Sequence, residues 1–189
     1  METVAEKLYT VAEYFEMEQH SEERHEFVNG NLIQMPGEST AANKIAGNIY
    51  ISLRILAKSQ PFEVYMQAVI LRVDELRNYR YPDVMVVQED GVSKNFADNP
   101  VVVVEVLSAG TEETDRSTKL LEYTAKPTLQ QYLLVAQDKM LVEVYARNGD
   151  KWEWTHHQNP TDAVELPLLG GRLPLREVYE GLGLSRKNA

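Results

Sequence analysis

The stretch VVVVEVL, residues 101–107, places one carboxylate, Glu105, inside an otherwise apolar run. β-Branched residues favour strands, and a near-continuous apolar run is typical of a strand that is covered on both faces. The stretch therefore predicts a buried, central strand. An unpaired carboxylate there would be costly or would lose its charge, so Glu105 needs a compensating partner. Two partners remain open: a Lys or Arg ion pair, or a divalent cation shared with other carboxylates.

A second carboxylate, Asp83, follows Pro82 at the start of a predicted strand over residues 83–88. Pro-Asp pairs commonly form turns, so a turn without a further role is the plain alternative. If this strand lies beside the strand of residues 101–107, we expect Asp83 and Glu105 to come close enough to share a metal ion.

Helical and strand patterns along the rest of the chain predict a mixed α/β protein. Thr10 and Glu13 have the form of a capping box, and Asn29-Gly30 fits a type I′ hairpin turn. We expect helices over residues 11–20, 40–59, 113–126 and 175–180, a hairpin over 25–35, further strands over 62–73, 131–136, 140–147 and 152–155, and a polar loop over 77–80. No repeat or linker interrupts this order, so we expect a single domain over residues 1–189.

Composition narrows the function classes. The 189 residues include no cysteine, which excludes a disulfide framework, a thiolate metal site and a Cys nucleophile. The first residues, METVAEKLYT, lack the order of a secretory signal, and no apolar run approaches the roughly 20 residues of a spanning helix, so we expect a cytoplasmic protein without membrane contact. The net charge of −10 makes the chain a poor general binder of polyanions, so a nucleic-acid role needs local positive charge or bound cations.

Two groups of cations are candidates for holding phosphate. One group lies on the second predicted helix and the other brackets the loop before Asp83: Lys44, Arg54 and Lys58, and Arg72, Arg77 and Arg80. The loop arginines are the better candidates, because a basic helix stripe is usually only a solvated face. The second helix also carries a second apolar strip, Ile51 and Ile55, which predicts burial under the sheet or against another subunit. A homodimer is therefore expected.

Other polar residues give weaker signals. Gln67 shares the strand region before Asp83 and is a candidate for orienting water by position alone. Ser108 has no Gly-x-Ser-x-Gly elbow around it, so we do not expect a serine nucleophile. His156 and His157 are adjacent on a predicted strand end, where their rings point to opposite faces and do not share a metal.

The order Pro82-Asp83 and then Glu105 inside a valine-rich strand resembles the PD-(D/E)XK arrangement of restriction-endonuclease-like nucleases. In the commonest form of that arrangement a lysine stands two residues after the second acid, but this position is Leu107 here. Lys119, on the helix that follows, is similar to the relocated lysine known within that superfamily. The plain alternative is an exposed i,i+4 ion pair between Lys119 and Asp115.

A wider pattern over about residues 10–147 resembles a bacterial putative restriction endonuclease family, formerly a domain of unknown function. The matching residues are Arg24-His25-Glu26, Gly30, Leu32, Tyr81-Pro82-Asp83-Val84, Glu105-Val106-Leu107-Ser108, Asp115, Lys119, Tyr123 and Tyr132-Leu133-Leu134-Val135. The sequence departs from the family at Ala109, where a proline is usual, and at Asn43, where a histidine is frequent.

The resemblance implies a restriction-endonuclease-like fold, a mixed β-sheet flanked by helices. It further implies Mg²⁺, with Mn²⁺ as a substitute, held by Asp83, Glu105 and Glu26, and a catalytic group of these acids with Lys119. The implied activity is a DNA endonuclease that hydrolyses phosphodiester bonds. The alternative is a degenerate nuclease scaffold that works as a binding or dimerisation module, to which the residue Leu107 and the acidic composition point.

Overall fold

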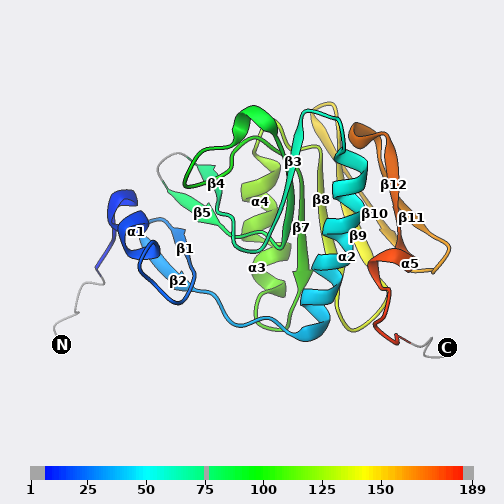
Figure 1. The fold of residues 1–189 in the computed structure, drawn as a ribbon, viewed down its shortest axis with the longest axis horizontal. Coiled ribbons are helices and arrows are strands. Elements are labelled where there is room, and N and C mark those ends of the chain that lie inside the picture. The colour runs from blue at the N-terminus through cyan, green and yellow to red at the C-terminus, as the bar shows by residue number, and fades with distance from the viewer. Residues whose placement is uncertain (1–6, 75–76, 185–189) are drawn as a thin grey trace.

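A computed structural model describes residues 7–74 and 77–184. The largest element of the fold is a six-stranded mixed sheet (Figure 1). The strands are β3 (Phe62–Met66), β6 (Val84–Gln88), β7 (Pro100–Leu107), β8 (Gln131–Ala136), β9 (Val142–Asn148) and β10 (Lys151–His157), in the spatial order β10-β9-β8-β7-β6-β3. Every residue of β7 is buried, so the prediction of a covered, central strand is confirmed. β7 and β8 run parallel, and the other neighbours in this sheet are antiparallel.

The parallel pair is connected by two short helices, α3 (Glu112–Arg116) and α4 (Thr118–Thr124). The prediction of one continuous helix over residues 113–126 is wrong, because Ser117 leaves the helical well at φ −122° and ψ −84°. The Ser117 hydroxyl donates to the carbonyl of Glu113 at 2.5 Å, which is a typical way for a serine to compete with the helix backbone. α4 buries Lys119 and Tyr123.

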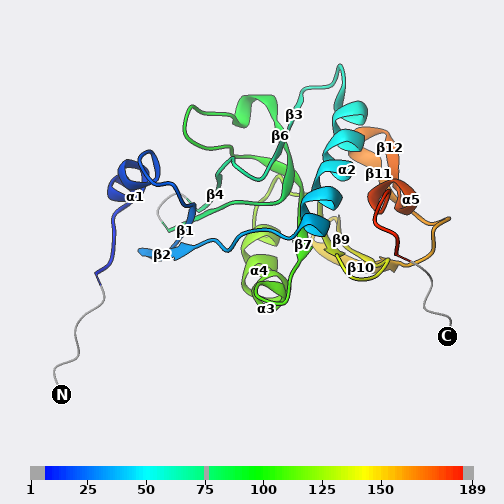
Figure 2. The ribbon, with the colours of Figure 1, turned by 60° about the horizontal axis from the view of Figure 1, so that its bottom comes forward.

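The opposite face of the sheet is covered by α2 (Thr40–Ala57), α5 (Leu175–Val178) and a hairpin of β11 (Ala163–Leu166) and β12 (Gly171–Pro174) (Figure 2). The predicted helix after Ser39 is confirmed: the Ser39 hydroxyl caps it, and Ile45, Ile49 and Leu53 are buried in the core. The β11–β12 hairpin was not predicted. Ile51 and Ile55 are 58% and 68% exposed, so burial of this strip under the sheet is wrong.

A smaller sheet has the strand order β2-β1-β5-β4, with β1 (His25–Val28), β2 (Asn31–Gln34), β4 (Leu71–Asp74) and β5 (Asn78–Arg80). It carries α1 (Val11–Glu18), whose predicted capping box is present. The predicted hairpin turn is confirmed by the positive φ angles of Asn29 (50°) and Gly30 (88°).

The prediction of a polar loop over residues 77–80 is wrong for β5. Tyr79 lies in an aromatic cluster with Tyr14 and Phe27, at ring-centroid distances of 5.8 and 6.1 Å. Burial of Tyr79 in the small sheet outweighs the polar composition of the neighbouring residues. Arg80, the next residue, is also buried, with 2% of its surface exposed. No helix among residues 7–74 and 77–184 is both long and apolar enough to cross a membrane.

Candidate functional site

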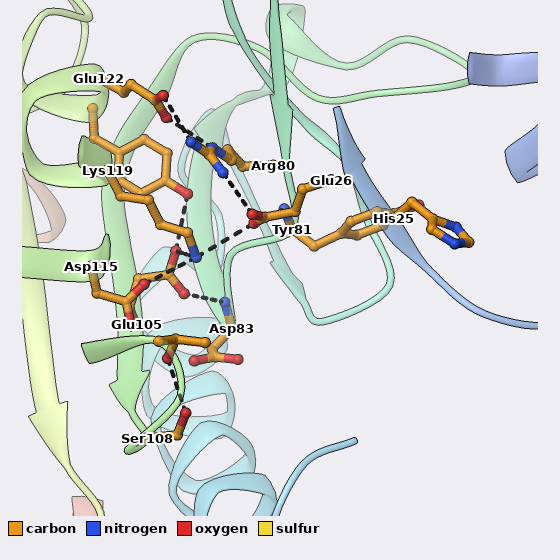
Figure 3. Close-up of polar contacts among 12 residues, drawn as sticks. His25, Glu26, Arg80, Tyr81, Asp83, Glu105, Ser108, Asp115, Lys119 and Glu122 are labelled. Atoms are coloured by element: carbon orange, nitrogen blue, oxygen red, sulfur yellow. Dashed lines mark hydrogen bonds and ion pairs between the residues drawn. The ribbon is translucent and has the colours of Figure 1, made fainter. Parts of the chain in front are cut away.

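The two acids singled out in the sequence lie on neighbouring antiparallel strands. Asp83 immediately precedes β6, and Glu105 lies in β7, where Val84 is paired with Val104. The Asp83 carboxylate accepts a hydrogen bond from the Val106 amide at 2.6 Å, and the Asp83 amide donates to Glu105 Oε2 at 3.4 Å. The sheet therefore brings the two carboxylates together, as expected from adjacent strands (Figure 3). Asp83 is partly exposed, so solvent reaches the pair from its side.

The Lys119 ammonium group reaches back from α4 into a cluster of acids (Figure 3). Its Nζ lies 3.1 Å from Glu105 Oε1, 3.1 Å from Asp115 Oδ1 and 3.4 Å from Glu26 Oε1. The i,i+4 pair with Asp115 is therefore real. The alternative of an exposed pair is wrong, because the side chains of Lys119 and Asp115 are only 7% and 2% exposed. Of the two partners left open for Glu105, the lysine ion pair is present.

Tyr123, one helical turn after Lys119, contacts the same carboxylate. Its hydroxyl donates to Glu105 Oε1 at 2.9 Å. Because Lys119 and Tyr123 are four residues apart on α4, both side chains point to the sheet side of the helix. Glu105 thus has donors from both residues and from the Asp83 backbone, which accounts for a carboxylate in an otherwise apolar strand.

A buried arginine extends the cluster into the small sheet. Arg80 donates from Nη1 to Glu26 Oε2 at 2.7 Å, and from Nε and Nη2 to the Glu122 carboxylate at 2.8 Å each. Glu26 in turn accepts from the Tyr81 amide at 3.4 Å. Glu26 is 6% exposed, so its carboxylate is buried although it lies on a hairpin strand.

The arginines predicted to hold phosphate have other positions. Arg80 is buried by the two glutamates, and Arg72 donates from Nε to Asp98 at 2.9 Å. Arg77 is exposed. The prediction that all three line a phosphate-binding loop is therefore wrong for Arg80, because its guanidinium is committed to Glu26 and Glu122.

Burial and neighbouring charges shift the pKa values of four groups in this cluster. Burial raises the pKa of Glu105 to about 8, even though the neighbouring Lys119 lowers it. Burial likewise raises the pKa of Asp83 to about 6, against the hydrogen bond from Val106. For Lys119, burial lowers the pKa, but Glu105, Glu26 and Asp115 together raise it above its ordinary value. Burial also acts to raise the pKa of Glu26, but Lys119 and Arg80 reverse this and leave it lowered.

A divalent cation such as Mg²⁺ needs several oxygen ligands around it. Across residues 7–74 and 77–184, no three Asp, Glu or His side chains are grouped so that they could already hold a metal ion. Lys119 occupies the centre of the acidic cluster, between Glu26 and Glu105. Asp83 and Glu105 nevertheless fit a hard cation: they are adjacent oxygen donors, one of them reachable from solvent, and both pKa values are raised in a way that a positive charge would reverse.

Two residues next to Asp83 complete the surroundings. Gln67 adopts a left-handed φ of 56° directly after β3, and its amide donates to the Asp83 carbonyl at 3.0 Å. Its side chain donates to Glu38, whose charge contributes to the raised pKa of Asp83. Sequence reasoning placed Gln67 near Asp83 by position but missed Glu38, which lies in a segment without helical or strand periodicity. It also missed the inward position of Arg80 and its pairing with Glu122.

Comparisons with known proteins agree over most of the chain. A sequence profile of a family described as "Putative restriction endonuclease" (Uma2) matches residues 11–176. "Uncharacterized protein sll1609" of Synechocystis sp. is 32% identical over 168 residues, 86% of this chain and 95% of the relative. "Uncharacterized protein slr1290" of the same organism is 31% identical over 173 residues, 90% of each chain.

A solved structure shares the fold. It is the crystal structure of a putative nuclease belonging to DUF820 from Anabaena variabilis, with a TM-score of 0.69 and 18% identity. The match covers 84% of this chain and 91% of that chain. The mixed sheet flanked by helices is therefore the restriction-endonuclease-like architecture predicted from the sequence.

Proposed function

The chain belongs to the putative restriction endonuclease (Uma2) family, and from this premise we propose that it is a Mg²⁺-dependent DNA endonuclease that hydrolyses phosphodiester bonds. The observation that carries the proposal is the position of Lys119, whose ammonium group lies 3.1 Å from Glu105 in a site that also holds Asp83. A lysine beside two acids on adjacent strands is the chemistry that the sequence pattern required, although Leu107 occupies the usual lysine position.

Asp83 and Glu105 are the proposed metal ligands, with Glu26 as the further acid of the site. A bound Mg²⁺ or Mn²⁺ would lower the pKa of a coordinated water and neutralise charge on the scissile phosphate. Asp83 is oriented for this by the Val106 amide, and Glu105 by Tyr123. Burial raises the pKa of Glu105, and a cation held by this carboxylate would favour its charged form.

Lys119 is the proposed catalytic cation. Its raised pKa keeps the ammonium group charged at any working pH, so it acts as a hydrogen-bond donor and fixed positive charge and not as a base. It would orient the attacking water or stabilise the charge that develops on the phosphate oxygens. Its three carboxylate neighbours hold it in place before substrate arrives, which is the preorganisation such a role requires.

Glu26 and Arg80 are proposed to position Lys119. Glu26 contacts Lys119 on one side and Arg80 on the other, and Arg80 also grips Glu122 on the same helix as Lys119. These ion pairs connect the small sheet to α4 beside Lys119. Glu26 is already shared by two cations, so its direct ligation of a metal ion stays a prediction.

Cleavage assays on single-residue variants test this function. Supercoiled plasmid and single-stranded oligonucleotides are incubated with the full chain in Mg²⁺ or Mn²⁺, alongside Asp83→Asn, Glu105→Gln and Lys119→Ala. Lys94→Ala and Asp90→Asn alter exposed groups outside the cluster and serve as matched controls. The proposal expects cleavage by the wild type and both controls, and loss in the three site variants. Equal cleavage by the wild type and Asp83→Asn would exclude the assigned site.

The exposed strip on α2 favours the second candidate, a nuclease-fold dimerisation module. Ile51 and Ile55 lie one turn apart and are more than half exposed, which is the surface that a second copy would cover. A homodimer formed through this strip is compatible with catalysis. Light scattering at several concentrations tests it, with a dimer mass expected for the wild type and a monomer mass for Ile51→Glu/Ile55→Glu. A dimer that persists in the double variant would exclude this surface.

A further inference from the structure

A row of side chains crosses the large sheet from the proposed site to its edge. Glu105 in β7 is paired with Leu134 in β8, Leu134 with Glu143 in β9, and Glu143 with His156 in β10. Directly paired residues point to the same face of a sheet, so this row lies on the face that carries α3 and α4. Three strand spacings of about 4.8 Å place His156 roughly 14 Å from Glu105.

The outer end of the row carries an exposed aromatic surface. Trp154 is 53% exposed, and its ring lies 5.3 Å from the ring of His156 at an interplanar angle of 33°. The indole Nε1 donates to Glu143 Oε2 at 3.3 Å, and Trp154 is paired across the strands with Tyr145. The indole is therefore fixed in orientation while much of its surface stays in contact with water.

Cations neutralise the carboxylate beneath this surface. Arg116 of α3 donates from Nη1 and Nη2 to the two oxygens of Glu143, at 2.8 and 2.6 Å. Arg147 stacks its guanidinium over the neighbouring Trp152 at 4.5 Å. A carboxylate that would repel a phosphodiester strand is thus paired, in a chain whose net charge is −10.

A depression of about 290 Å³ lies at the carboxyl ends of β7 and β8. It is lined by residues that include Ser108, Arg116, Gln137 and Lys139 and two acids, Glu112 and Asp138. Ser108 follows Glu105 by three residues, and Arg116 contacts the glutamate on which Trp154 rests. Arg116 is therefore shared by the depression and by the carboxylate on which the indole of Trp154 rests.

We propose that Trp154 and His156 stack the unpaired bases of a nucleic-acid strand whose backbone enters the Asp83–Glu105 site. This inference rests on the proposed nuclease function and names its substrate as DNA with a single-stranded segment beside the cleaved bond. Every base has a π-face, so a fixed, exposed aromatic pair binds unpaired bases with little sequence preference. The bases of a duplex are already stacked on each other and cannot offer their faces.

Binding measurements separate base stacking from phosphate contact. Fluorescence anisotropy compares an oligothymidylate of roughly 12 nucleotides with an abasic phosphodiester of the same length and with the matching duplex, all in EDTA so that no strand is cut. The proteins are the full-length wild type, Trp154→Ala and Trp154→Phe. Leu168→Ala is the matched control, because it truncates an exposed apolar side chain between β11 and β12, a hairpin on the opposite face of the sheet.

The proposal expects the wild type to bind oligothymidylate about fivefold or more tightly than the abasic strand, the factor for one stacked base. Trp154→Ala should lose that preference without weaker binding of the abasic strand, whereas Trp154→Phe and Leu168→Ala should keep it. Equal affinity of the wild type for both strands would overturn the proposal. A change of mass in light scattering for Trp154→Ala, with unchanged DNA binding, would overturn it in favour of a second copy.

The same variants distinguish this inference from the function on which it rests. In one outcome the wild type cleaves DNA, and Trp154→Ala binds and cleaves a single-stranded substrate as well as the wild type does. The stacking proposal is then wrong, and the proposed nuclease function is retained. In the other outcome the wild type cleaves no DNA in Mg²⁺ or Mn²⁺, but it binds oligothymidylate more tightly than the abasic strand, and Trp154→Ala loses this preference. The proposed nuclease function is then wrong, and the stacking proposal is retained.

Discussion

The two faces of the six-stranded sheet differ in what they bury. Val102, Val104 and Val106 of β7 point into an apolar core shared with α2, α5 and the β11–β12 hairpin. The alternate residue Glu105 points to the other face, where Lys119 and its acidic neighbours are buried with it. Replacing a buried ion pair with apolar groups is often neutral or stabilising, so stability alone does not account for this charged face. The difference indicates that one face is covered by an apolar core alone, whereas the other combines a second apolar core, which includes Val103 and Leu134, with the buried charges of the proposed site.

The largest expected effect is on the charged face. Asp83→Asn removes a proposed metal ligand with little change of volume, and Lys119→Ala removes the proposed catalytic cation. Each should lower kcat by roughly 10³-fold, comparable to the loss of one preorganised electrostatic group in other hydrolases. The thermal midpoint of Asp83→Asn should stay near that of the wild type. Single-turnover cleavage rates and thermal melts measure the two quantities, and a folded Lys119→Ala with full activity would remove the lysine from the mechanism.

A substitution on the apolar face should lower stability and leave activity unchanged. Ile49 is fully buried on α2, so Ile49→Ala should lower the free energy of unfolding by about 2–5 kcal/mol through lost burial and a cavity. The cleavage rate per folded molecule should be unchanged, because α2 packs against the other side of the sheet. Urea unfolding and activity at a temperature where the variant is folded measure this. A large loss of specific activity would mean that the two faces are not separable.

A smaller effect is expected at Arg80, which is buried beside the proposed site and contacts Glu26 and Glu122. Arg80→Lys retains the charge but loses the forked contact with Glu26 and Glu122, so Lys119 is held less firmly. We expect kcat to fall by about 10–100-fold with little change of KM, because residues that hydrogen-bond to a catalytic or ligating side chain and fix its orientation have effects of this size. The pH profile of kcat should shift as well, since the charges around Glu105 move.

Arg72→Lys is the matched control, because it alters another arginine–carboxylate pair, with Asp98, in a different part of the molecule. It should leave the pH profile unchanged. If Arg80→Lys loses stability but keeps the wild-type pH profile, Arg80 is only structural.

A further expected effect concerns the dependence of stability on pH. The pKa of Glu105 is about 8 in the folded protein, above the value of 4.5 for a free glutamate, because burial disfavours its charge. The folded state then binds more protons than the unfolded state between these values, so this group lowers the free energy of unfolding as pH rises from about 5 to 8. Glu105→Gln, which resembles the protonated acid, should lose less stability over that range. Parallel slopes for the two proteins, from urea unfolding at several pH values, would contradict the raised pKa.

Much of this arrangement was predictable from local pattern. The valine run fixed the position of β7, Thr10 and Ser39 marked the starts of α1 and α2, and Asn29-Gly30 marked the hairpin. Glu105 and Asp83 were also singled out, because a carboxylate in an apolar strand needs a partner, and Lys119 was named through the resemblance to the nuclease superfamily.

Long-range contacts account for what was missed. The inward position of Arg80 depends on Glu26 and Glu122, which are 54 and 42 residues away along the chain. The aromatic surface at Trp154 depends on the register of β9 and β10 and on a short α3 that leaves this part of the sheet uncovered. Nothing in the local sequence distinguishes an exposed arginine or tryptophan from a buried one.

Metal binding to the charged face is the most direct test of the account. Mn²⁺ is titrated by calorimetry into the wild type, Asp83→Asn and Glu105→Gln at neutral pH. The account predicts binding by the wild type and affinity at least roughly 10-fold weaker in each variant. Equal affinity in all three proteins would contradict the assignment of Asp83 and Glu105 as the metal-binding pair.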